Sequence, residues 1–389
     1  MKAKILALTT AIAITMSTSV FALEEVNKIE SVEGIMLSDD VVSSADMFEQ
    51  ARLSMIEDEL ESYGVLEEGS VLESELLKNS NVDSLSADRG KFDIVMSMVS
   101  NSNLDSQDKQ DLMEKIERLS EATVVHIDSD TGEVFDSENG FVGYAESVEE
   151  QNFIQDQDYE NEFEESVGDS FVGGVEAIEP LSKNNPTSRE CHGGNTGAFE
   201  RKQLGYNGFD KITSSLTLPT ITIPSTDSSD TKKIKKEQSW VYYGFDSKSG
   251  SAIEGGFAHQ TGSARWLPFI RVGSIHYQHS NNVTPYYDGN TINDFNFVLK
   301  KPTSSSSRYT AYLYIGSGNL LLSCSTNFTT SDVRTMSVKR MTTIAKNGFD
   351  STSSSPAKAI YTKSRNQRFS NIRVRRFGKT SYENWGAFS

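Results

Sequence analysis

The chain has 389 residues, with 37 Lys and Arg against 55 Asp and Glu, so its net charge is −18. This length suggests two or three domains of about 150 residues each. After residue 22 no stretch is apolar enough to form a membrane-spanning helix, so we predict a chain with no membrane span.

The first 22 residues have the features of a secretory signal peptide. Lys2 and Lys4 precede an apolar stretch over residues 5–14, and Val20-Phe21-Ala22 is a small-residue cleavage site. The apolar stretch is too short for a stop-transfer helix. We therefore predict a bacterial protein that is secreted and is extracellular or bound to the cell surface.

Charge is divided unevenly along the chain. Residues 23–180 hold 8 Lys and Arg and 42 Asp and Glu, a net charge of −34, whereas residues 181–389 hold 27 and 13, a net charge of +14. Halves of opposite sign indicate different partners or mutual masking. One predicted partner of the basic half is therefore the chain's own acidic N-terminal region.

Apolar periodicity predicts a small, acidic, mainly helical α+β region over residues 23–145. In its clearest helix, residues 105–120, Leu112, Ile116 and Leu119 share one face. A hairpin is predicted over residues 123–135, with Asp130-Thr131-Gly132 at the bend. The other predicted helices are residues 45–63, 71–79 and 88–100.

Residues 146–187 are dense in like charge, which disfavours a packed core, and are predicted to form an acidic disordered linker. A basic domain over residues 188–389 follows. Acidic residues behind a signal peptide also fit a pro-segment or an intramolecular chaperone, and the sequence leaves these possibilities open.

The basic domain is rich in short β-branched and aromatic runs separated by turn residues. This spacing predicts an antiparallel β-sandwich or jelly roll, with a closed barrel as the alternative. Residues 240–273 form the central part, a three-stranded meander. The predicted strands are residues 209–218, 240–246, 252–259, 266–272, 274–278, 294–299, 308–315, 320–327, 336–345, 359–362 and 369–377.

Three motifs in this domain point to a family. Trp240-Val-Tyr-Tyr-Gly-Phe-Asp, Glu254-Gly-Gly-Phe and Arg265-Trp-Leu-Pro-Phe-Ile-Arg-Val-Gly resemble the secreted, uncharacterised YrpD-like family of Gram-positive bacteria. Val338-Lys-Arg-Met-Thr-Thr-Ile-Ala resembles the run near the C-terminal end of that family. The resemblance covers residues 188–377 and implies a secreted β-rich domain, with no catalytic residues to carry over.

Cys191 and Cys324 are the two cysteines, and export makes a disulfide between them the predicted state. The alternative is a free catalytic thiol at Cys191, beside His192. Adjacent residues seldom face each other, and no family signature surrounds this pair.

Catalytic and metal motifs are weak. The basic half has no Gly-x-Ser-x-Gly elbow and no His-Glu-x-x-His. Counted from Asp128, the Gly and Glu positions of a calcium loop hold Glu133 and Asn139. We predict no catalytic residues, no metal and no cofactor. An enzymatic alternative is a polysaccharide lyase with an acidic pro-segment, in which Arg271, His276 and Tyr277 bind the sugar and abstract a proton.

The function predicted first is non-enzymatic binding of carbohydrate or an anionic cell-envelope polymer, because aromatic faces stack on sugar rings and the basic half suits a polyanion. A structural matrix or coat protein is a further alternative. An exported protein is not expected to meet nucleic acid, so we predict none as a partner. The predicted ligand-binding residues are Trp240, Tyr242, Trp266, Arg271, Tyr286 and Tyr312.

Overall fold

The computed structural model describes residues 44–67, 72, 87–147, 189–190, 197–222, 237–249, 251–259, 264–279, 286–346 and 363–385. Within these ranges, residues from Val42 onward belong to one compact unit. None of the described helices is long and apolar enough to cross a membrane.

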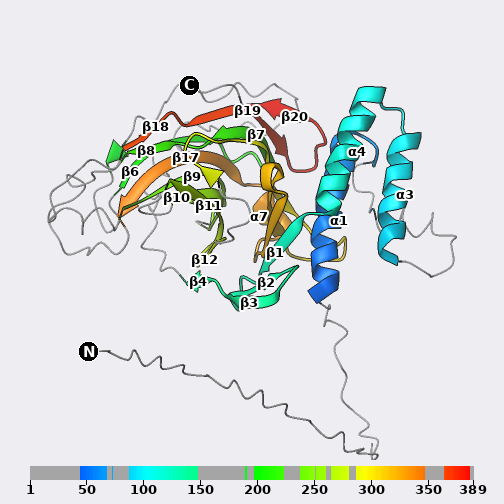
Figure 1. Cartoon of the computed structure of the whole chain (residues 1–389), viewed down its shortest axis with the longest axis horizontal. Coiled ribbons are helices and arrows are strands. Elements are labelled where there is room, and N and C mark those ends of the chain that lie inside the picture. Colours follow the sequence, from blue (N-terminus) through cyan, green and yellow to red (C-terminus); the bar gives the residue numbers. More distant parts are fainter. Residues whose placement is uncertain are drawn as a thin grey trace, which may run out of the picture. The chain divides into compact units, whose positions relative to one another are not determined.

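Three helices form the N-terminal part, α1 (Ser44–Ser62), α3 (Ala87–Asn101) and α4 (Ser106–Ser120) (Figure 1). Helix α4 begins where the Asp105 side chain accepts a hydrogen bond from the Asp108 amide, and it buries the predicted face of Leu112, Ile116 and Leu119. Three of the predicted helices are thus confirmed, whereas the one at residues 71–79 falls almost wholly outside the described residues.

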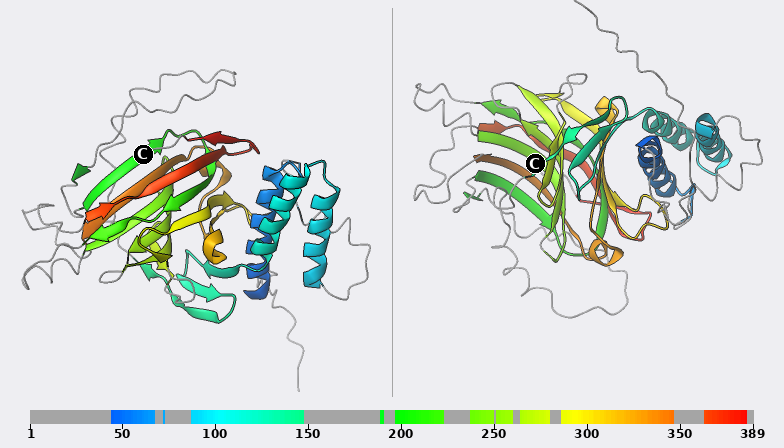
Figure 2. Two further views of the ribbon diagram at one scale, coloured as in Figure 1. Left: turned by 45° about the horizontal axis from the view of Figure 1, so that its top comes forward. Right: turned by 90° about the horizontal axis from the view of Figure 1, so that it is seen from below.

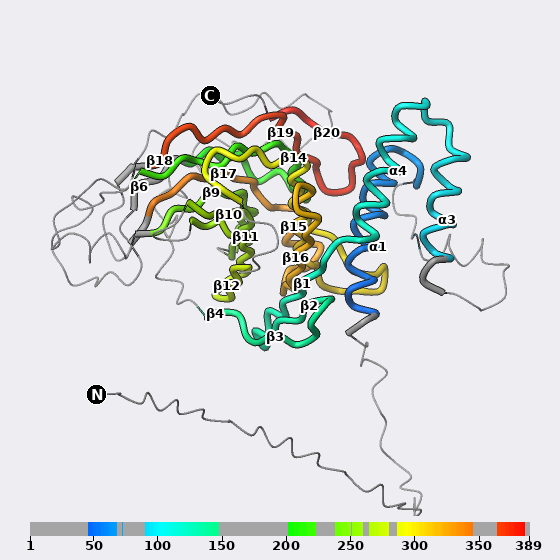
Figure 3. Tube along the Cα trace, in the orientation of Figure 1, coloured from blue at the N-terminus to red at the C-terminus, as the bar shows by residue number. Residues whose placement is uncertain are grey.

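The strands form two large, mainly antiparallel sheets, called sheet A and sheet B here (Figures 1 and 3). Sheet A, in spatial order, contains β20 (Tyr382–Asn384), β19 (Arg368–Arg376), β7 (Phe209–Thr217), β14 (Thr291–Lys300), β15 (Thr310–Ile315), β16 (Leu320–Ser325), β1 (Thr123–Ile127), β2 (Glu133–Asp136) and β3 (Gly140–Tyr144).

Sheet B contains, in spatial order, β4 (Glu146–Ser147), β12 (Ile275–Gln278), β11 (Arg265–Val272), β10 (Ala252–His259), β9 (Glu237–Asp246), β17 (Ser337–Lys346), β6 (Gly197–Leu204) and β5 (Arg189–Glu190). β13 (Tyr286–Tyr287) pairs with β11, and β8 (Thr220–Thr222) pairs with β18 (Lys363–Arg365). The 3-10 helix η2 (Gly316–Gly318) and the short helix α7 (Thr330–Val333) complete the described elements.

Most predicted strands are confirmed within a few residues, including the central meander, in which β9, β10 and β11 are antiparallel neighbours. The predicted strand at residues 359–362 lies outside the described residues. The predicted N-terminal hairpin forms as β1 and β2, but β1 also pairs in parallel with β16. The N-terminal region therefore contributes strands to the same sheet as the basic domain.

The two sheets pack face to face around the main core (Figure 2). Tyr243 and Phe245 of β9 contact Phe295 and Phe297 of β14, with ring centroids 5.5 and 5.2 Å apart. The predicted β-sandwich is therefore confirmed at the level of two packed antiparallel sheets, and a jelly-roll strand order stays a prediction.

The other face of sheet A packs against the helices. A second core joins Met55, Ile56 and Leu60 of α1 to side chains of β1, β14, β15 and β16, with Tyr312 and Tyr314 among them. Both faces of this sheet are thus apolar, as expected for a sheet covered on two sides.

A cluster of buried charges lies between α1 and sheet A. Lys211 of β7 and Arg375 of β19 contact the Asp58 carboxylate, and Arg375 Nε lies 2.9 Å from Asp210 Oδ1. Lys211 Nζ also lies 3.1 Å from Glu59 Oε1. Burial alone would raise the pKa of Asp58, but Arg375 and Lys211 outweigh it and hold that pKa well below its usual range.

Asp58→Asn removes the carboxylate shared by Lys211 and Arg375, both fully or almost fully buried. Because breaking a buried ion pair leaves an uncompensated charge, we expect the free energy of unfolding to fall by about 3–5 kcal/mol in urea denaturation. The control is Asp130→Asn, which breaks an exposed pair with Arg308 and should change it by less than about 1 kcal/mol. Equal losses in both variants would contradict this role of Asp58.

Candidate functional site

Side chains on β9 alternate between the core and the opposite face of sheet B. Val241, Tyr243 and Phe245 point into the core, so Trp240, Tyr242 and Asp246 lie on the other face. The strand register extends this face across six strands. We call it the polar face, and its charged or ionisable members near the centre are Arg201, Asp246, Lys339, Glu254, Arg271 and His276.

Ion pairs of alternating sign run across the polar face. Arg201 Nη2 lies 3.1 Å from Asp246 Oδ2, and Lys339 Nζ lies 2.8 Å from Asp246 Oδ1. Lys339 Nζ also lies 3.0 Å from Glu254 Oε1, and Arg271 Nη1 lies 3.3 Å from Glu254 Oε2. All five side chains are buried, which makes their mutual attraction stronger than on an open surface.

Gly244 makes the contact between Lys339 and Glu254 possible. In the register, Gly244 of β9 lies between Lys339 of β17 and Glu254 of β10. A Cβ atom on Gly244 would lie 2.7 Å from Lys339 Cε. The missing side chain therefore lets the lysine cross one strand and reach a carboxylate two strands away.

The electrostatics keep Glu254 ionised. Burial alone would raise its pKa, but Lys339 and then Arg271 outweigh burial and lower the pKa of Glu254 to about 2. Burial, together with the Arg271 charge, lowers the pKa of His276 to about 4, so its imidazole is neutral near neutral pH. Glu254 is consequently a poor proton donor, whereas His276 is unprotonated near neutral pH but is a weaker base than an ordinary imidazole.

An aromatic cluster adjoins these charges on the polar face, formed by Trp240, Tyr242, Ala258, Phe269 and Met341. The Tyr242 and Phe269 rings meet edge to face, 5.8 Å apart, and the Tyr242 hydroxyl donates to Met341 Sδ at 3.1 Å. A Cβ atom on Gly256 would lie 2.2 Å from the Val241 carbonyl oxygen. Neighbouring protein atoms therefore approach Gly256 too closely for a side chain at this position.

The structure divides the six predicted ligand-binding residues between three places. Trp240, Tyr242 and Arg271 lie on the polar face. Trp266 and Tyr286 lie in the main core, where Trp266 Nε1 donates to Asp288 Oδ1 at 2.8 Å. Tyr312 lies in the second core, beneath the helices.

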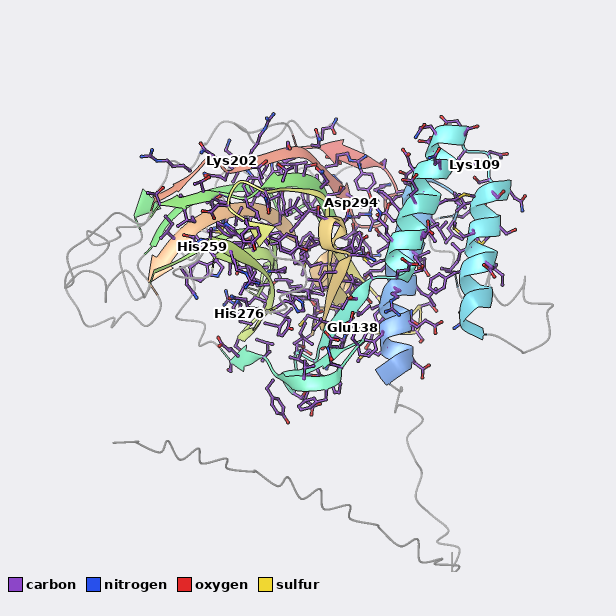
Figure 4. All side chains as sticks on the ribbon, viewed as in Figure 1. Lys109, Glu138, Lys202, His259, His276 and Asp294 are labelled. Carbon is purple, nitrogen blue, oxygen red and sulfur yellow. The ribbon has the colours of Figure 1, made fainter. Side chains whose placement is uncertain are left out.

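The residues of the predicted lyase alternative are also separated. Arg271 and His276 are direct cross-strand neighbours on the polar face. Tyr277 follows His276 on β12 and so points to the other side, where its ring packs against the core and its hydroxyl lies 3.1 Å from His279 Nδ1. His259 lies elsewhere, at the end of β10 (Figure 4), with Nε2 3.6 Å from Asp288 Oδ1.

Sequence reasoning missed Arg201 and Lys339. Arg201 lies in β6, whose Glu-Arg-Lys-Gln run gave no strand signal. Lys339 lies in a strand that was predicted, but a lysine in such a strand is normally read as solvated. Alternation along β17 places it on the same face as Met341, which was the one available signal.

The predicted disulfide is not observed among the described residues. Cys324 is a free thiol within the core, and burial raises its pKa well above the usual range. Cys191 lies outside the described residues, so the pairing stays a prediction.

The described part of the chain also holds no group of three His, Cys, Asp or Glu side chains placed to bind a metal ion.

No family model matches the chain, and no curated protein matches it in sequence. Among solved structures, scytalido-glutamic peptidase with a transition-state analogue inhibitor is 14% identical and has a TM-score of 0.32, over 51% of this chain and 85% of that chain. The CBM2 module of an evolved Dit from Lactobacillus casei BL23 phage J-1 is 10% identical with a TM-score of 0.23, over 45% and 69%.

Alginate lyase A1-II′ is 11% identical with a TM-score of 0.22, over 47% of this chain and 80% of that chain. Similarities this low do not assign a function to the chain.

Gly244→Ala should disrupt the contact between Lys339 and Glu254. The new methyl group overlaps the lysine stem and lies 3.0 Å from the Ile253 carbonyl oxygen. We expect a loss of about 1–3 kcal/mol in the free energy of unfolding, measured with urea. Gly90→Ala in α3 is the matched control, since its methyl group meets nothing within 4 Å and should stabilise the helix by up to ~1 kcal/mol. Similar results for the two variants would refute the proposed role of Gly244.

His276→Gln should flatten part of the dependence of stability on pH. The lowered pKa of His276, about 4, means that the unfolded chain binds a proton at higher pH than the folded one. Stability from this residue is therefore lost as pH falls from about 6.5 towards 4, by up to ~3 kcal/mol. Urea titrations between these pH values should show a smaller fall for the variant, and parallel curves would contradict the prediction.

Proposed function

We propose that the protein is exported and binds carbohydrate or an anionic cell-envelope polymer on the polar face of sheet B, without catalysing a reaction on it. One observation supports this function above others: Trp240 and Tyr242 share one sheet face with Arg271. Export and the resemblance to the YrpD-like family are part of the proposal and rest on the sequence.

The chemistry of the polar face suits a sugar chain that carries acidic groups. Guanidinium groups bind carboxylate or phosphate through paired hydrogen bonds, and aromatic rings pack against the apolar faces of sugars. Four cations, Arg201, Arg265, Arg271 and Lys339, share this face with three carboxylates, Asp246, Glu254 and Glu146, the last lying opposite His276 on β4. The excess positive charge favours an anionic ligand.

The protonation states support binding over proton transfer. Glu254 is held ionised by two cations, and Tyr277 lies on the opposite side of the strand from Arg271. The neutral imidazole of His276 beside Arg271 is the observation that favours the second candidate, a polysaccharide lyase in which His276 abstracts the proton.

Arg271→Gln tests the proposed site. It removes one cation, while Lys339 remains to pair with Glu254. In native gels cast with polygalacturonate, we expect retardation of the wild-type protein and a roughly tenfold weaker affinity for the variant, because a charged hydrogen bond contributes about 1.5–3 kcal/mol. Arg308→Gln, which changes an exposed arginine elsewhere, is the control and should bind like wild type.

Loss of retardation in both arginine variants would show binding by net charge alone and would count against the polar face.

The same polymer also separates the two candidate functions. Ultraviolet absorbance from unsaturated sugar products that disappears in His276→Gln would establish the lyase and overturn the binding proposal.

A further inference from the structure

Exposed aromatic side chains gather on β3, the edge strand of sheet A. Phe141, Val142 and Tyr144 are 51%, 48% and 69% exposed, whereas Trp240 and Tyr242 on the polar face are 7% and 5% exposed. We call these three side chains the β3 platform. Large apolar groups exposed together commonly mark a binding surface.

The platform rings form a continuous strip. Phe141 meets Tyr144 edge to face with ring centroids 5.4 Å apart, and meets Phe135 of β2 at 5.6 Å. Phe135 is half-buried and packs against the second core beneath the helices. The strip is therefore anchored at one end and exposed at the other.

The backbone of β3 is poorly shaped for pairing with another strand. The register with β2 shifts between Val134 and Phe135, and Gly140 and Gly143 have φ values of 71° and 139°. Bulges and left-handed residues interrupt the regular row of amide and carbonyl groups that an added strand needs. A ligand is thus expected to contact the rings more than the backbone.

The charges around the platform are acidic. Residues 123–145 contain five Asp and Glu and no Lys or Arg, and one of the five, Asp130, pairs with Arg308 at 3.2 Å. Glu133 lies opposite Tyr144 in the register, and Glu138 is exposed. This surface repels polyanions and other copies of itself, but its carboxylates accept hydrogen bonds from hydroxyl groups.

We propose that the β3 platform is a second binding site, for an uncharged polysaccharide chain. Sugar rings supply apolar faces for Phe141 and Tyr144 and hydroxyl donors for the neighbouring carboxylates. The site lies on sheet A, is distinct from the polar face of sheet B, and does not depend on the function proposed for that face.

Tyr144→Ala and Phe141→Ala test the platform, and both side chains are exposed enough for truncation to leave the fold intact. In native gels cast with hydroxyethylcellulose, mannan or soluble chitin oligosaccharides, we expect retardation of the wild-type protein by at least one of these probes. Each variant should lower that affinity by up to about tenfold. Tyr287→Ala changes a tyrosine on β13 that is 47% exposed, close to the 51% of Phe141; this variant is the control and should bind like wild type.

Arg271→Gln should also leave binding of the uncharged probe unchanged, which separates this site from the polar face. Equal loss in Tyr287→Ala, or no retardation of the wild type by any of the three uncharged probes, would overturn the proposal.

Analytical ultracentrifugation provides a further check. A wild-type dimer that Tyr144→Ala dissociates would identify the platform as an interface between copies and would likewise overturn it.

Discussion

Burial of Lys211 and Arg375 between a helix and a sheet is the constraint on which the N-terminal half depends. Neither cation is stable in such a place without a carboxylate, because burial removes its hydration and an apolar environment offers no interaction that compensates for this loss. Asp58 and Glu59 supply those carboxylates from α1, and Lys115 of α4 lies 3.1 Å from Glu59. Helix α1 is therefore held in one register against β7 and β19.

The same constraint bears on a removable pro-segment. Strand β1 lies between β16 and β2 inside sheet A, and α1 covers the second core. Removing residues 42–147 would expose Tyr312 and Leu321 and would leave Lys211 without the carboxylates of Asp58 and Glu59. A cut between the two halves would leave these contacts in place, so cleavage and separation of the halves are different events.

Sequence patterns predicted the positions of helices and strands well, but they predicted the buried charged contacts between these elements poorly. Short aromatic and β-branched runs between turn residues located strands such as β10, and period-3.6 spacing located α4, because both signals depend on residues close in sequence. The parallel pairing of β1 with β16 joins residues nearly 200 positions apart, and nothing in either strand specifies it. Buried Lys211, Lys339 and Glu254 follow no local pattern, since a charge is buried only where a distant partner meets it.

The candidate site was predictable to the same extent. Trp240, Tyr242 and Arg271 were identified from residue type, and only the strand register places them on one face. Trp266 and Tyr286, which are of the same residue types, belong to the core instead. Phe141 and Tyr144 were not identified, because the predicted hairpin ended at residue 135 and no strand was predicted at Gly140–Tyr144. Exposure, which sequence does not reveal, is what distinguishes a platform from a core.

Ionic strength should separate the roles of the charges. Buried pairs such as Lys211 with Asp58 are screened little by salt, because ions do not enter the space between them. Attraction of a polyanion to the polar face acts through solvent. It weakens as added salt shortens the screening length, which is about 10 Å at 0.1 M. Stacking on the β3 platform involves no net attraction between charges and persists in salt. Salt therefore distinguishes fold stability and uncharged-glycan binding from anionic-polymer binding within one chain.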